Sequence, residues 1–176
     1  MKLRSFSRML QMSVYMAAAG CATAPSVPAP LQVPTTQGLI KQLRATGVQI
    51  YQCQPTKSDP SQFEWAFKQP EAALLTKGGK NFGRHYAGPS WEANDGSKVI
   101  GEMVARYDSP NPNSIPWLLL RAKATSGNGV FTDVQFVQRL NTVGGNAPVA
   151  ACRQEQAGQQ LRASYTADYL FYGAKR

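Results

Sequence analysis

The sequence contains few of the residue types that most enzyme chemistry requires. Its 176 residues include one histidine, three cysteines and ten acidic residues, and no acidic residue precedes Asp59. One histidine and widely spaced cysteines do not readily make a closed zinc site. Gly-x-Ser-x-Gly, His-Glu-x-x-His, Walker and Cys-x-x-Cys motifs are absent, so the corresponding enzyme classes lose their support. We therefore predict no metal and no cofactor.

A membrane-spanning apolar run is also missing. The apolar stretch at residues 9–20 is interrupted by Gln11 and is shorter than the ~20 residues that a spanning helix needs. It follows three basic residues, Lys2, Arg4 and Arg8. Basic residues before a short apolar run are typical of a cleaved export signal. The sequence therefore predicts a signal peptide over residues 1–20.

The end of this signal resembles a lipoprotein cleavage site. Residues 18–21 read Ala-Ala-Gly-Cys, with Ala18 where such sites usually have leucine. Lipidation of Cys21 would hold the protein on a membrane surface without any part of the fold crossing it. We expect an exported lipoprotein of the bacterial cell envelope, either periplasmic or on the outer membrane. The alternative is ordinary signal cleavage, which would leave Cys21 as a free thiol and the protein secreted.

The chain that follows the signal divides into a linker and one domain. Residues 21–37 contain four prolines among small and polar residues, which predicts an extended, mobile tether. Residues 38–176 are long enough for a single domain with its own core.

The remaining charge is basic. The net charge of the whole sequence is +9, and the chain stays basic after the three basic residues of the signal are removed. Such a surface favours anionic neighbours, here an envelope glycan or lipid, although a scattered basic surface can serve solubility alone. Nucleic acid is not an expected partner, because export separates the protein from it and no binding motif is present. The sequence identifies no protein partner.

Two cysteines remain if Cys21 is acylated. An exported location permits oxidation, so we predict a disulfide between Cys53 and Cys152. It would close a loop of about 100 residues, for which the chain-entropy model gives roughly 4–5 kcal/mol. A catalytic thiol would instead need a nearby base, which only His85 could provide.

Short alternating patterns predict strands throughout the domain. Apolar and polar residues alternate at 48–53, 63–68 and 165–172, and turn residues at 94–96 and 127–129 predict hairpins over 91–106 and 115–140. The first hairpin leaves two registers open, with Trp91 opposite Val99 or Ile100. In the second, Val130, Val134, Phe136 and Leu140 fall on one face, opposite Asp133, Gln135 and Arg139. The apolar run at 117–120 indicates a strand covered on both sides, and residues 70–77 could form two helical turns.

These patterns predict an all-β domain. We expect a single antiparallel β-barrel or β-sandwich of about eight to ten short strands with glycine-rich turns. The barrel is favoured over the sandwich, because closure protects the sheet edges of an exported protein.

Five blocks of sequence also resemble a known family: GVQIYQC at 47–53, GRHYAGPSWEANDGSKVIG at 83–101, IPWLLLRAKATSGNGVF at 115–131, VQRLNTVGGNAP at 137–148 and YTADYLFYG at 165–173. They are similar to the domain of unknown function 3455 family, whose members are exported proteins of bacteria and fungi. The resemblance implies one exported domain. It supplies no activity and no catalytic residue.

One polar and aromatic cluster remains as a candidate site. It contains Arg84, His85, Trp91, Glu92 and Asp95. Exposed aromatic residues beside arginine and carboxylate can form a sugar or small-ligand platform. His85 paired with a carboxylate would instead provide a general base. Both have a structural alternative, in which the aromatic residues pack in the core, His85 is hydrogen-bonded and Asp95 forms its turn.

The sequence therefore predicts a ligand-binding or structural module of the cell envelope. The alternative is a small hydrolase or lyase that uses His85. Exposure of Trp91 and Trp117 would favour a surface platform, whereas a cavity that encloses His85 with a carboxylate would favour catalysis.

Overall fold

The computed structural model describes residues 26–175. The predicted signal peptide and the predicted lipidation site, Cys21, lie outside the described residues. Among residues 26–175, no helix is long and apolar enough to cross a membrane.

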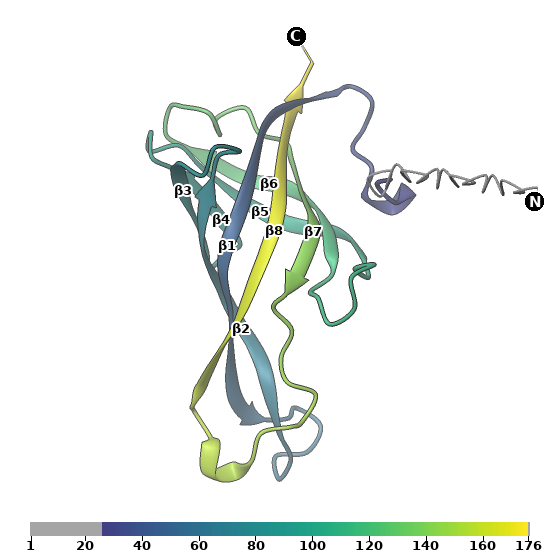
Figure 1. Ribbon diagram of the computed structural model, residues 1–176, viewed down its shortest axis with the longest axis vertical. Helices are drawn as coiled ribbons and strands as arrows, with labels where there is room; N and C mark the ends of the chain where they lie inside the picture. Colours follow the sequence, from purple (N-terminus) through teal and green to yellow (C-terminus); the bar gives the residue numbers. More distant parts are fainter. Residues whose placement is uncertain (1–25, 176) are drawn as a thin grey trace, which may run out of the picture.

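Eight antiparallel strands form one closed sheet (Figure 1). Each strand pairs with the next along the chain, and the last pairs with the first, which gives an up-and-down barrel. The strands are β1 (Gln37–Pro55), β2 (Phe63–Leu75), β3 (Asn81–Tyr86), β4 (Ser90–Ala93), β5 (Lys98–Tyr107), β6 (Trp117–Ser126), β7 (Phe136–Gly144) and β8 (Gln160–Ala174). The predicted all-β, antiparallel fold is confirmed.

Three of the strands are longer than expected. β1, β2 and β8 contain 19, 13 and 15 residues. The two helical turns suggested at residues 70–77 are absent, because β2 continues to Leu75 and buries Ala72 and Leu74 on alternate positions. Pro70 is tolerated because β3 pairs with β2 only from Ala72 onward, so the missing N–H of Pro70 interrupts no bond to β3.

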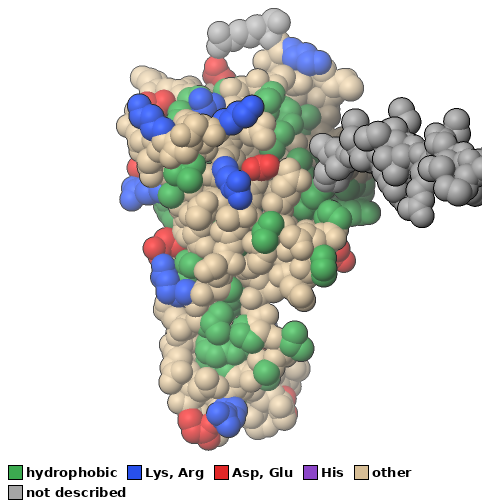
Figure 2. Space-filling view, in the orientation of Figure 1, with side chains coloured by type: hydrophobic (Ala, Val, Ile, Leu, Met, Phe, Trp, Pro, Cys, Tyr) green, Lys and Arg blue, Asp and Glu red, His purple; other side chains and the backbone are tan. Residues whose placement is uncertain are grey.

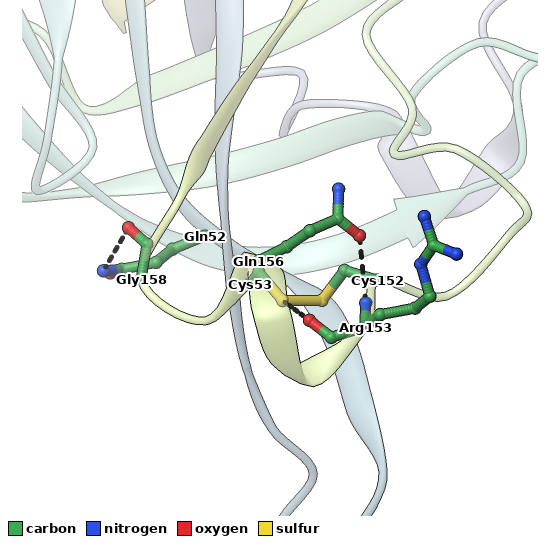
Figure 3. Close-up of a disulfide and its surroundings, with 6 residues drawn as sticks. All are labelled: Gln52, Cys53, Cys152, Arg153, Gln156 and Gly158. Atoms are coloured by element: carbon green, nitrogen blue, oxygen red, sulfur yellow. Dashed lines mark hydrogen bonds between the residues drawn. A yellow bond between two sulfur atoms is a disulfide. The ribbon is translucent and has the colours of Figure 1, made fainter.

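The long strands extend beyond the barrel as an arm, at the bottom of Figure 1. Here the last residues of β1 pair with the first residues of β2 on one side and of β8 on the other. The predicted disulfide between Cys53 and Cys152 is present, with the Cα atoms 5.9 Å apart, and ties the loop before β8 to β1 (Figure 3). The Cys53 N–H also donates to the Gln159 carbonyl, and the Gly158 N–H to the Cys53 carbonyl.

The first predicted hairpin has the register with Trp91 opposite Val99. Its turn closes through a bond from the Ala93 N–H to the Ser97 carbonyl at 2.9 Å. Gly96 has a φ of 85°, a conformation that residues with a side chain rarely adopt.

The second predicted hairpin differs from the structure. Its second arm begins at Phe136 rather than Val130, and residues 127–135 form a loop that packs across one end of the barrel. Phe131 and Val134 of this loop are buried in the core, where the Phe131 ring lies 4.5 Å from that of Phe171. This end of the barrel is therefore closed.

The faces of β7 also differ from the simple pattern. Phe136 and Leu140 point outward beneath the N-terminal segment, whereas Val137 is in the barrel core and Arg139 lines the interior. Both faces of the strand contain large apolar residues, so hydrophobicity alone does not distinguish inside from outside.

The N-terminal segment covers one side of the barrel. Leu31, in the short 3-10 helix η1 (Ala29–Leu31), is fully buried with Trp117, Leu119 and Leu140. The Gln138 amide donates to the Leu31 carbonyl at 2.6 Å. The expectation that residues 117–120 are covered on both faces is confirmed. Residues 26–33 do not behave as the mobile tether that the sequence predicts, because their apolar side chains pack against the outside of the barrel.

Candidate functional site

The five residues predicted from the sequence are divided between three places. β3 and β4 pair with His85 opposite Trp91 and with Arg84 opposite Glu92. Because side chains alternate along a strand, the first pair points into the barrel and the second points outward. Asp95 lies in the turn after β4. The five residues do not form one site.

The outward pair is a surface ion pair. Arg84 donates through Nη2 to both carboxylate oxygens of Glu92, at 3.0 and 3.1 Å, and the Tyr86 hydroxyl donates to Glu92 at 2.7 Å. These two neighbours lower the pKa of Glu92, with the Tyr86 hydrogen bond as the larger cause. Both carboxylate oxygens of Glu92 accept hydrogen bonds inside this cluster, on the outer face of the barrel.

Asp95 holds two turns together. One carboxylate oxygen accepts from the Ser97 backbone N–H, and the other accepts from the Val130 N–H, both at 2.9 Å. Bonds from Ser97 and then Val130 lower the pKa of Asp95. The carboxylate of Asp95 therefore bonds the loop of residues 127–135, which closes one end of the barrel, to the turn of the first hairpin.

His85 and Trp91 lie inside the barrel. Their rings stack with centroids 4.6 Å apart, and Tyr169 lies 5.0 Å from His85. His85 Nδ1 is 2.8 Å from the Ser90 carbonyl, so Nδ1 carries the proton and Nε2 is the free acceptor. Burial lowers the pKa of His85 from its ordinary 6.5 to about 3, and the imidazole is neutral at physiological pH.

These two residues line a cavity in the open half of the barrel. Its volume is about 560 Å³, within the ~300–1,000 Å³ typical of small-molecule sites. The inner part is lined by Gln49, His85, Trp91, Arg139 and Tyr169. Trp91 and Trp117 are both buried, which removes the basis for an exposed aromatic platform. Trp91 faces the internal cavity instead.

Three buried polar atoms on the cavity residues have no partner within residues 26–175. They are Gln49 Nε2, Trp91 Nε1 and the Tyr169 hydroxyl, on side chains no more than 2% exposed. The nearby Tyr165 hydroxyl is also buried without a hydrogen-bond partner. Tyr165 and Tyr169 lie close enough to affect each other's pKa, yet their hydroxyls do not reach hydrogen-bonding geometry. A buried polar group without a partner costs about 1–3 kcal/mol, so this cluster is suited to bind something polar.

Arg139 brings a positive charge to the same cavity. It lies between Leu118 of β6 and Tyr169 of β8, and its Nε and Nη2 donate to the Pro116 carbonyl at 3.0 and 2.9 Å. Burial raises the pKa of Tyr165 and Tyr169, and the charge of Arg139 opposes that rise. Both hydroxyls are therefore neutral, and the Tyr169 oxygen lies close to the guanidinium of Arg139.

The mouth of the cavity is apolar and basic. Phe67 and Met103 line it and are 56% and 60% exposed. Lys68 and Arg106 also line it and are exposed. Glu102 lies at the rim but is bound to Arg121 at 2.7 Å, so its charge is already paired.

Sequence reasoning missed Gln49, Arg139 and Tyr169. The available signal was a polar residue within an inward-facing series, such as Gln49 between Gly47 and Tyr51. Such a residue is recognisable only once the inward face of each strand is known. Within the described part of the chain, no group of three histidine, cysteine or acidic residues could hold a metal ion.

Fold and cavity together define a small antiparallel barrel with an internal chamber that is open at one end and lined by apolar side chains and a few polar ones. The chain belongs to the family described as protein of unknown function (DUF3455), whose model matches residues 34–173. Comparisons with curated proteins and with solved structures found no match.

Proposed function

We propose that this protein binds a small ligand in its barrel cavity. The observation that carries the proposal is the cluster of Gln49 Nε2, Trp91 Nε1 and the Tyr169 hydroxyl, which are buried without partners around a cavity of about 560 Å³. Buried polar groups in a structural core are mostly paired, and here three of the unpaired ones gather around one cavity. Their retention next to a cavity supports a binding role.

The proposal includes export and attachment to a membrane. The basic and apolar pattern of residues 1–20 and the cysteine at position 21 support a lipid-anchored protein of the bacterial envelope. The Cys53–Cys152 disulfide also favours an oxidising compartment. In the orientation of Figure 2, lysine and arginine are dispersed among acidic and uncharged side chains, which gives no reason to prefer a glycan partner on this face.

The alternative, a hydrolase or lyase based on His85, has less support. A base whose pKa is about 3 takes up a proton poorly near neutral pH. Within the described residues 26–175, no carboxylate orients the ring, because Nδ1 is bound to the Ser90 carbonyl and Glu102 is paired with Arg121. The neutral imidazole is better suited to accept a hydrogen bond through Nε2.

A thermal-shift screen of the exported protein with the substitution Cys21→Ser tests the binding proposal. A ligand of the native state raises the melting temperature with concentration. We expect saturable shifts that weaken in Tyr169→Phe, which deletes one cavity hydroxyl. Tyr172→Phe is the matched control, because Tyr172 is on the same strand and donates to Gln138 outside the cavity. The proposal would be contradicted if the shift in melting temperature weakened equally in the two variants, or if no compound shifted the melting temperature of the protein with an unsubstituted cavity.

A further inference from the structure

The charge inside the cavity restricts the chemistry of the ligand. Arg139 is half-buried and lines the cavity, and none of the ion pairs among residues 26–175 includes it. A partly desolvated cation is costly unless an anion or several acceptors stand against it. Among residues 26–175, Arg139 donates to the neutral Pro116 carbonyl, and the Tyr169 hydroxyl that lies close to its guanidinium is also neutral.

Arg139 retains donors for such an anion. A guanidinium has five N–H groups in a planar fork, and the Pro116 carbonyl takes two of them. Three remain, enough for a bidentate contact with a carboxylate. Glu102, the one carboxylate among the residues that line the cavity, is bound to Arg121 and is 51% exposed at the rim.

The neutral groups around Arg139 are also donors. The Tyr169 hydroxyl and the amide Nε2 of Gln49 are buried in the same wall without partners. An anion would accept from both and from the guanidinium together. Neutral molecules or water could satisfy the amide and the hydroxyl but would leave the charge of Arg139 uncompensated.

The mouth indicates what the rest of the ligand resembles. Phe67 and Met103 expose apolar side chains beside Lys68 and Arg106. An apolar surface that begins inside a cavity and reaches solvent suits a ligand with an apolar body.

We propose that the cavity binds an organic acid, with its carboxylate at Arg139, Gln49 and Tyr169 and its apolar body toward Phe67 and Met103. This inference rests on the proposed ligand-binding function and specifies the ligand class.

Isothermal titration with two acid and alcohol pairs tests it: decanoate against decanol, and 2-naphthoate against 2-naphthylmethanol. The protein is the exported chain with Cys21→Ser, in which residues 26–175 are unchanged. We expect at least one acid to bind at least tenfold more tightly than its alcohol. Decyl phosphate serves as a third arm and separates a carboxylate site from a general anion site, because tighter binding of the phosphate would contradict the carboxylate assignment.

The variants place the acid in the cavity. Arg139→Met should abolish the preference for the acid, and Arg139→Lys should keep part of it, because a lysine retains the charge without the fork. Arg162→Met is the matched control, since Arg162 pairs with Glu71 at 2.9 Å on the surface. If Arg139→Met does not fold, Tyr169→Phe tests the same contact, with an expected loss of acid affinity of threefold or more.

The outcomes separate the two proposals. Equal affinity for acid and alcohol, with binding still sensitive to Tyr169→Phe, would overturn the organic-acid inference and leave the cavity function intact. An equal loss in Arg162→Met and Arg139→Met would also overturn it. Absence of binding by every probe at millimolar concentration would contradict both.

Discussion

His85 is a buried histidine whose neutral form depends on the fold. In the unfolded chain its pKa is near 6.5, whereas burial lowers it to about 3 in the native protein. Between these values the unfolded state binds more protons, so the native state loses stability as the pH falls. The slope approaches about 1.4 kcal/mol per pH unit.

We therefore expect the free energy of unfolding to decrease from pH 6.5 to 4.5. Denaturant titrations at several pH values measure it, and His85→Gln should flatten the curve over this range. Glu92, Asp95 and Glu102 have lowered pKa values and lose their contribution at lower pH, as each is protonated. A slope unchanged in His85→Gln would assign the effect to other groups.

Tyr169 and Tyr172 should respond in opposite ways to loss of their hydroxyls. The Tyr169 hydroxyl is buried without a partner, so Tyr169→Phe should leave stability unchanged or raise it by about 1–2 kcal/mol. The Tyr172 hydroxyl donates to Gln138 at 2.8 Å, so Tyr172→Phe should cost about 0.5–1.5 kcal/mol. Chemical denaturation of both variants measures the difference. A destabilised Tyr169→Phe would mean that this hydroxyl is paired within the protein.

At the scale of elements, the N-terminal segment acts as part of the core. Leu31 is fully buried against Trp117, Leu119 and Leu140. Leu31→Ala removes this packing and should cost about 2–4 kcal/mol. Thermal or denaturant unfolding measures the loss, with Leu39→Ala as a control, because Leu39 is 54% exposed. Equal effects in the two variants would contradict the packing role of this segment.

The alternation of residues was sufficient to place several strands. The inward series Tyr165, Ala167, Tyr169 and Phe171 is buried as its period indicates. Two features were not accessible in this way. β7 has apolar residues on both faces, so Arg139 was assigned opposite the apolar face, and the proline-rich segment before β1 has too little apolar character to reveal that Leu31 is buried.

The candidate site was less predictable than the fold. His85 and Trp91 were recognised as notable residues, but their neighbours in sequence, Arg84 and Glu92, point to the opposite face of the sheet. The residues that join them in the cavity come from β1, β7 and β8. Closure of the barrel brings these strands together, and no local pattern encodes that proximity.

For the whole molecule, the proposed lipid anchor makes a direct prediction. The unsubstituted protein should sediment with membranes, and Cys21→Ser should shift it to the soluble fraction, because the acyl chains would provide the attachment. Intact mass of the purified protein checks for the acyl groups. A protein that stays with membranes in Cys21→Ser, or carries no acyl mass, would contradict the anchor.

The loop of residues 127–135 determines which end of the barrel is open. Phe131 and Val134 fill the end of the barrel opposite the mouth, and Asp95 fastens the loop in place. The barrel is therefore a cup rather than a tube. A ligand bound as proposed would enter past Phe67 and Met103 and leave by the same route, so the cavity could hold a small molecule but could not conduct it through the barrel.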